Sequence, residues 1–210
     1  MLEILLSMDP LVVAGFILSG LLLNVTPGVD FVLVTSSAIN GGPRIGRAAA
    51  TGITLGVLVH IFAAAAGVSA LLLAYPAAYD VIRIIGAAYL VYLAWQAWTA
   101  NSDAKTNAEG PPALSFDAAL RRGFLTNVMN PKTALFIFAF IPQFTNPDIG
   151  PLWQQIVILG AIFAFNGYIF DLLLGTAAGH LAPFLRRHIR ILNKLTAILF
   201  GGLAARLAFD

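Results

Sequence analysis

Long apolar runs separated by short polar stretches fill the chain from residue 10 to its end. Six of these runs approach or exceed the length of a membrane-spanning helix: 10–39, 48–74, 84–100, 123–145, 151–177 and 189–209. A hydrocarbon core of ~30 Å needs about 20 apolar residues per helix. The last run is the weakest, because only residues 195–205 are free of charge and its Arg and Lys side chains would have to reach the membrane surface. We therefore predict an all-α membrane protein with six transmembrane helices.

Composition supports lipid as the solvent. Of the 210 residues, 59% are hydrophobic and only 10% are charged. One water-soluble core cannot bury that much apolar surface. The first ten residues contain Glu3 and Asp9 but no Lys or Arg, which favours a retained first span over a cleaved signal peptide. Because the chain has no cysteine, disulfides and thiolate metal sites are excluded. No cofactor, resident metal or nucleic-acid partner is expected.

The basic residues predict the orientation. If all six segments span the membrane, their connections alternate between its two sides. One side carries Arg83 and Arg206, and Lys132 lies within a span. By the positive-inside rule the other side is cytoplasmic, and both termini are then extracytoplasmic; if the last segment did not span, the C-terminus would be cytoplasmic. The basic residues on the predicted cytoplasmic side are Arg44, Arg47, Lys105, Arg121, Arg122, Arg186, Arg187, Arg190 and Lys194.

A polar stretch near the middle divides the chain into two similar halves. Residues 101–117, NSDAKTNAEGPPALSFD, read as a cytoplasmic linker within one transmembrane domain, between repeats at residues 1–100 and 118–210. Three spans per repeat would insert the second repeat in the opposite sense, an arrangement common in transporters. Chance similarity between apolar helices is the alternative. The ordered matches are NVTP (24–27) with NVMNP (127–131), Gly56-x-x-x-His60 with Gly167-x-x-x-Asp171, and IRII (82–85) with IRIL (189–192).

The first helix of each repeat is predicted to break at a proline. Pro27 and Pro131 each lie inside an apolar segment, where proline removes an amide hydrogen and clashes with the preceding turn. Backbone groups freed by such a break are not tolerated against lipid and must line a protein-buried or water-filled cavity. The second half-helix would present free amides and a positive dipole end to that cavity. Two breaks at similar depth predict one central site.

Two charged residues follow these prolines. Asp30 and Lys132 are functional candidates, because a charge near the bilayer centre costs ~3 kcal/mol or more. They match a zwitterionic amino acid, whose carboxylate would take the amides from Gly28 onward near Lys132 and whose ammonium would take Asp30 and freed carbonyls. The alternative for Asp30 and Lys132 is a structural ion pair that holds the two halves together. The alternative for Thr26 and the Asn residues is capping of the broken helix ends. The predicted substrate-binding residues are Asn24, Thr26, Pro27, Gly28, Asp30, Asn127, Asn130, Pro131 and Lys132.

Two further titratable residues occupy matching positions of the two halves. His60 and Asp171, together with Asp30, are candidates for proton transfer or for counter-ions to the substrate. A packed histidine bonded to one backbone carbonyl is the alternative for His60. Asp171 lies nearer the cytoplasmic end of its span, so partial extension toward the membrane surface is the alternative there.

Several of these segments together resemble the bacterial lysine-exporter and homoserine/threonine-resistance family, the LysE/RhtB type. The order and spacing are specific as a set, whereas no single segment would be, and the resemblance covers essentially the whole chain. The segments are NVTPGVD (24–30), GGPRIGR (41–47) followed by Gly52 and Gly56, GAAYL (86–90), GFLTN (123–127) leading into Asn130-Pro131-Lys132, and FIPQF (140–144).

The resemblance implies a six-helix exporter of amino acids or close derivatives such as homoserine, threonine or lysine. It further implies proton exchange as the driving force and the cytoplasmic membrane of a bacterium as the location. The partners would be the amino acid, protons and lipid, with a homodimer left open. One position departs from the family pattern, since the usual Pro-Gly-Pro-Asp is here Pro27-Gly28-Val29-Asp30. Val29 therefore keeps an amide hydrogen that proline lacks.

Other functions are less compatible with the residues. An exporter of inorganic or metal cations is the main alternative, but such sites need clustered His, Cys or carboxylate groups, and the three histidines are far apart in the sequence. An intramembrane enzyme lacks support, because Ser36 and Ser37 have no histidine at a suggestive spacing. A passive channel would need a ring of charges or carbonyls that one chain does not supply.

Overall fold

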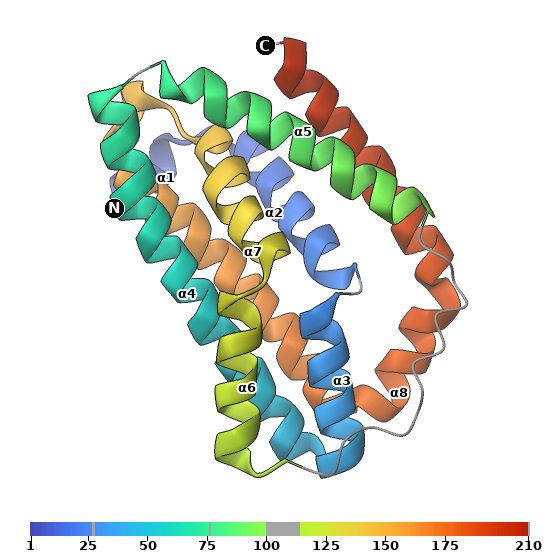
Figure 1. The fold of residues 1–210 in the computed structure, drawn as a ribbon. Coiled ribbons are helices and arrows are strands. Elements are labelled where there is room, and N and C mark those ends of the chain that lie inside the picture. Colours follow the sequence, from blue (N-terminus) through green and yellow to red (C-terminus); the bar gives the residue numbers. More distant parts are fainter. Residues whose placement is uncertain (27, 76, 100–113, 210) are drawn as a thin grey trace.

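Helices make up most of the structure, a computed structural model that describes residues 1–26, 28–75, 77–99 and 114–209 (Figure 1). No strand is present among these residues, which confirms the predicted all-α fold. Most of the predicted linker, residues 101–113, lies outside the described residues, as does Pro27. The α-helices are α1 (Leu2–Ser7), α2 (Pro10–Val25), α3 (Val29–Gly41), α4 (Pro43–Ala74), α5 (Ala78–Thr99), α6 (Phe116–Val128), α7 (Pro131–Leu135) and α8 (Leu152–Phe209).

The two predicted helix breaks are present. Helix α2 ends at Val25 and α3 begins at Val29, with a bend of 54° between them. Helix α6 ends at Val128, and the chain from Pro131 to Phe144 is bent from it by 51°. Figure 1 shows both breaks near the middle of the molecule, with α2 and α7 above them and α3 and α6 below. Each bent pair has the length and composition of one interrupted membrane span.

The structure does not confirm all six predicted spans. By length and composition, the described residues contain three helices able to cross a membrane, or up to five if each bent pair is one span. The predicted sixth span and the inverted repeat therefore remain predictions. Residues 178–188, expected as a connection, are helical, and they belong to the second of two helices that meet at a kink at Ala177 within α8 (Figure 1). This stretch contains Leu, Ala and Arg, which favour helix, together with Gly179 and Pro183, which do not.

The segment after α7 departs from a regular α-helix. A π-helical turn at Phe136–Phe140 is followed by a 3₁₀ turn at Ile141–Phe144. Pro142 has no amide hydrogen for a continuing α-helix, so the hydrogen-bond pattern must change near it. The rings of Phe136 and Phe140 lie 4.6 Å apart, and Phe16 of α2 contacts both. This aromatic cluster packs the segment against α2.

Glycines allow α4 and α6 to pack with their backbones in contact. A Cβ atom on Gly52 of α4 would collide with the carbonyl oxygen of Leu120, and one on Gly123 of α6 would collide with that of Ala49. Close approach through small residues is a common way for helices to associate in lipid, where burial of apolar surface gives little driving force. The α4–α6 contact thus fixes the lower half of the second break relative to the rest of the molecule.

We expect Gly52→Val to abolish correct folding, because the added side chain must push α6 away from α4. The expected loss of stability is about 3 kcal/mol or more. Gly67→Val is the matched control on the same helix, since nothing lies within 4 Å of a Cβ built at Gly67. Gel filtration and thermal unfolding of the detergent-purified variants measure the difference. Equal unfolding temperatures for the two variants would contradict the packing described here.

Candidate functional site

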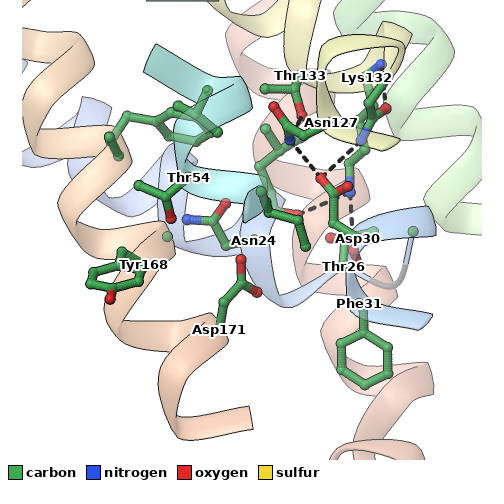
Figure 2. A pocket seen from close by; sticks show the side chains of 18 residues that line it. Asn24, Thr26, Asp30, Phe31, Thr54, Asn127, Lys132, Thr133, Tyr168 and Asp171 are labelled. Carbon is green, nitrogen blue, oxygen red and sulfur yellow. Dashed lines mark hydrogen bonds between the residues drawn. The ribbon is translucent and has the colours of Figure 1, made fainter. Parts of the chain in front are cut away.

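A cavity lies where the two helix breaks meet. The space between its walls, including its open mouth, is about 560 Å³. Eight of the residues predicted to act on substrate or protons line it: Asn24, Thr26, Gly28, Asp30, Asn127, Asn130, Lys132 and Asp171 (Figure 2). Pro131 and His60 were also predicted to act there but do not line the cavity. Pro131 is exposed at the start of α7, and the His60 side chain is buried outside the cavity lining.

The Asp30 carboxylate is held on one side only. Its Oδ2 atom accepts hydrogen bonds of 2.9 Å from the Nδ2 atoms of both Asn127 and Asn130, which come from the other half of the chain. Its Oδ1 atom is shielded from solvent and has no hydrogen-bond partner. A buried carboxylate oxygen without a donor is costly. The geometry therefore leaves one strong acceptor at the cavity wall ready for a donor.

Lys132 binds backbone rather than Asp30. Its Nζ atom donates hydrogen bonds of 3.0 Å to the carbonyl oxygens of Leu23 and Thr26, at the end of α2. No salt bridge joins Lys132 to Asp30, so the direct structural pair considered as an alternative is absent from this structure. The helix break frees these carbonyls from their intrahelical partners. The ammonium of the second half thus stabilises the broken end of the first.

The start of α3 faces this ammonium. Gly28 precedes the helix, and a Cβ atom there would lie 3.7 Å from Nζ of Lys132. Val29 is the first helical residue, a position where proline is favoured because its amide needs no intrahelical acceptor. Val29 occupies the position at which the family pattern has a second proline. Unlike proline, it has an amide hydrogen, which adds one free donor at the positive end of α3.

Two of the predicted polar residues also cap broken helix ends. Thr26 follows α2, and its Oγ1 atom donates to the carbonyl of Leu22 at 2.6 Å and lies 3.1 Å from the Oγ1 atom of Thr196. Asn130 precedes α7, and its Oδ1 atom accepts from the amide of Lys132 at 3.0 Å. Asn127 lies in the last turn of α6, and its side chain also donates to Thr133 at 3.3 Å. Capping and support of Asp30 are thus combined in Asn130.

We expect Asn130→Ala to lower transport at least tenfold and stability by about 2 kcal/mol, because it removes a helix cap and one donor to Asp30. Asn146 provides a matched control, since it also precedes a proline and caps a helical turn through Asp148, outside the cavity. Asn146→Ala should lower stability alone. Transport assays normalised to folded protein make the comparison, and an equal loss of transport in both variants would contradict the role of Asn130.

The opposite wall contains Asp171 of α8 and Asn24 of α2. Figure 2 shows the Asp171 carboxylate pointing into the cavity toward Asn24. Asp171 lines the cavity and forms no hydrogen bond or salt bridge with another described residue. The Nδ2 atom of Asn24 is buried without an acceptor and packs near Gly167, where a Cβ atom would lie 3.3 Å away. The cavity therefore holds an unused donor and two incompletely used carboxylates.

His60 supports the site from outside. It is buried, and its Nε2 atom lies 3.1 Å from the backbone carbonyl of Asn127. Its ring packs edge-on against Phe138 at 5.9 Å. These contacts correspond to the packed histidine considered as an alternative from the sequence. His60 therefore steadies the end of α6, the helix that carries Asn127.

Several cavity residues had not been singled out from the sequence. Phe31, Ile53, Val57 and Phe163 give the cavity an apolar wall, and Thr54, Thr133 and Tyr168 add hydroxyl groups. Their positions depend on which faces of the helices point into the cavity. Because these helices are apolar on nearly all sides, their sequences have no clear 3.6-residue periodicity that would identify the inward face. Only Gly167 had drawn attention, through the match between the two repeats.

Comparison with known proteins gives the family. The profile of the LysE type translocators matches residues 21–210. A leucine efflux protein of Salmonella choleraesuis is 29% identical over 196 residues, covering 92% of each chain. An uncharacterised membrane protein of Vibrio cholerae is 32% identical over 198 residues, covering 93% of this chain and 94% of the relative. No solved structure matches significantly. The chain belongs to the LysE type translocator family.

Proposed function

We propose that the protein exports amino acids with aliphatic side chains from the bacterial cytoplasm and binds them in the cavity between the helix breaks. The proposal rests on the cavity groups that have no hydrogen-bond partner. The unpartnered Oδ1 atom of Asp30 would accept the substrate ammonium. The substrate carboxylate would take the free amides at the start of α3, near Lys132. An amino-acid zwitterion supplies one charge of each sign at this spacing.

The remaining wall suits an apolar side chain. Phe31, Ile53, Val57 and Phe163 line the cavity beside the polar groups, and an aliphatic substrate side chain would displace water from them. The relatives named leucine efflux proteins agree with this preference. Leucine is therefore the first substrate to test, ahead of the homoserine-, threonine- or lysine-like substrates suggested by the family resemblance.

Location and energy source complete the proposal. The family favours the cytoplasmic membrane of a bacterium, and the basic residues favour both termini outside it. Exchange with protons would drive export. The alternative of a metal-cation exporter gains no support, because the described residues contain no group of three or more His, Cys, Asp or Glu side chains placed to hold a metal ion.

Export from intact cells tests the proposal. Cells that express the protein are loaded with leucyl-alanine, and the leucine released into the medium is followed by mass spectrometry. We expect release several times faster than from cells carrying an empty vector, with Gly67→Val as an active control outside the site. No stimulated release of leucine, or of any other amino acid supplied as a dipeptide, by correctly inserted protein would overturn the proposed function. Stimulated export of Mn²⁺ or Zn²⁺ instead would support the cation alternative.

A further inference from the structure

Asp171 is the charged group of the cavity that the structure leaves without any partner. Asp30 receives two amide donors and Lys132 binds two carbonyls, but the Asp171 carboxylate lines the cavity and forms no hydrogen bond or salt bridge with a described residue. Within a membrane helix, an ionised carboxylate needs a positive partner or a proton. Asp171 must therefore be neutralised in the empty protein by something other than its neighbours.

The groups that surround Asp171 do not supply a positive charge next to it. Asp30 faces it from α3, and Lys132 lies beyond Asp30 on α7, engaged with backbone (Figure 2). Tyr168, one turn earlier on α8, lies 3.3 Å from the hydroxyl of Thr51. The wall residues from α2, α4 and α6 are uncharged. With all three charged groups ionised, the cavity carries one net negative charge.

We infer that Asp171 couples transport to protons, because a proton and the substrate ammonium alternate on its carboxylate. This inference rests on the proposed function. In the cytoplasm-facing state, the arriving ammonium forms an ion pair with ionised Asp171, and the carboxyl proton leaves to the cytoplasm. In the outward-facing state, a proton from outside bonds to a carboxylate oxygen of Asp171 and breaks the ion pair. The ammonium then leaves with the substrate, and at each stage the Asp171 carboxylate is partnered by either a proton or the substrate ammonium.

The direction of coupling follows from the orientation of the substrate. An ammonium placed between Asp30 and Asp171 stabilises the ionised carboxylates and expels the proton, which gives exchange. A substrate carboxylate at the same place would retain the proton and give cotransport. Lys132 and the amides of α3 favour the first orientation, because they attract the substrate carboxylate away from Asp171. The placement of these charges therefore determines that protons and substrate move in opposite directions.

Proton release on binding tests the inference directly. L-leucine is added to the purified full-length protein in weakly buffered detergent with a pH indicator. We expect up to one proton released per leucine bound, and leucine affinity that rises up to tenfold per pH unit while Asp171 is protonated. Asp171→Asn should bind leucine more weakly, release no proton and show affinity independent of pH. Asp148→Asn, in an exposed turn, is the matched control and should behave as wild type.

Each other outcome has a defined meaning. If wild-type protein binds leucine without releasing protons, or if Asp171→Asn releases as many, the inference is overturned while the proposed function stands. If neither leucine nor any other amino acid binds to folded wild-type protein, the proposed function fails and the inference fails with it. If Asp171→Asn does not fold, the wild-type pH profile decides, because affinity that does not rise with pH contradicts competition at this carboxylate.

Discussion

Asp30→Asn is expected to reduce leucine transport at least 100-fold while the protein remains in the membrane. The substitution removes the negative charge that faces the substrate ammonium. The new amide has one acceptor oxygen in place of two, and its NH2 group cannot accept the hydrogen bonds that Asn127 and Asn130 donate. The loss corresponds to about 3 kcal/mol of interaction with the substrate. Efflux from leucine-loaded proteoliposomes, with the amount of reconstituted protein matched, measures the effect.

The exposed Asp148 provides the control for this experiment. Asp148→Asn removes the same charge from a surface turn and should transport as wild type does. Asp30→Glu, which keeps the charge but displaces it by one methylene group, should retain a small part of the activity. Transport by Asp30→Asn within a factor of two of wild type would show that the carboxylate does not bind the substrate.

Lys132→Met is expected to lower both stability and transport. Methionine has a similar length but cannot donate a hydrogen bond, so the carbonyls of Leu23 and Thr26 would lose their shared donor. Leaving two such groups without a partner should cost about 2–5 kcal/mol. Loss of the positive charge near α3 should also prevent capture of the substrate carboxylate. Thermal unfolding in detergent and proteoliposome efflux report the two effects separately.

Lys194→Met is the matched control for Lys132. Lys194 is exposed on α8, where its ammonium lies 6.0 Å from the ring centre of Trp98. Such an exposed contact contributes only about 0.5–1 kcal/mol. The control should therefore unfold close to the wild-type temperature and remain active. An unfolding temperature for Lys132→Met no lower than that of the control would contradict the role of Lys132 at the break.

The helix breaks could be predicted from the sequence because their cause is local. Proline beyond the first turn disfavours the continuation of a helix, and Asn130-Pro131 combines a cap with a favoured first helical residue. Once both breaks were placed at mid-membrane, the juxtaposition of Asp30 with the second half followed from the need to satisfy freed backbone groups. The structure brings Asp30 to Asn127 and Asn130 as that reasoning requires.

Other features depend on tertiary packing and were not readable from the sequence. An ammonium can bind either a carboxylate or free carbonyls, so the sequence does not tell which of these Lys132 binds. The relative positions of the half-helices place its Nζ atom against the carbonyls at the end of α2. The role of His60 behind Asn127 depends on the contact between α4 and α6. Residues 178–188, where the pattern of apolar residues predicts a connection, are helical beyond the kink at Ala177 although they include Gly179 and Pro183.

Substrate protection of a single cysteine tests the central claim most directly, since the chain has no cysteine of its own. Thr54→Cys is nearly isosteric and places a thiol at the cavity wall, and the native hydroxyl bonds only to the Ala50 carbonyl of the same helix. L-leucine should slow alkylation of this thiol at least tenfold, and leave that of a surface cysteine, Asp148→Cys, unchanged. Equal alkylation rates with and without leucine, in protein that still exports leucine, would show that the substrate does not occupy this cavity.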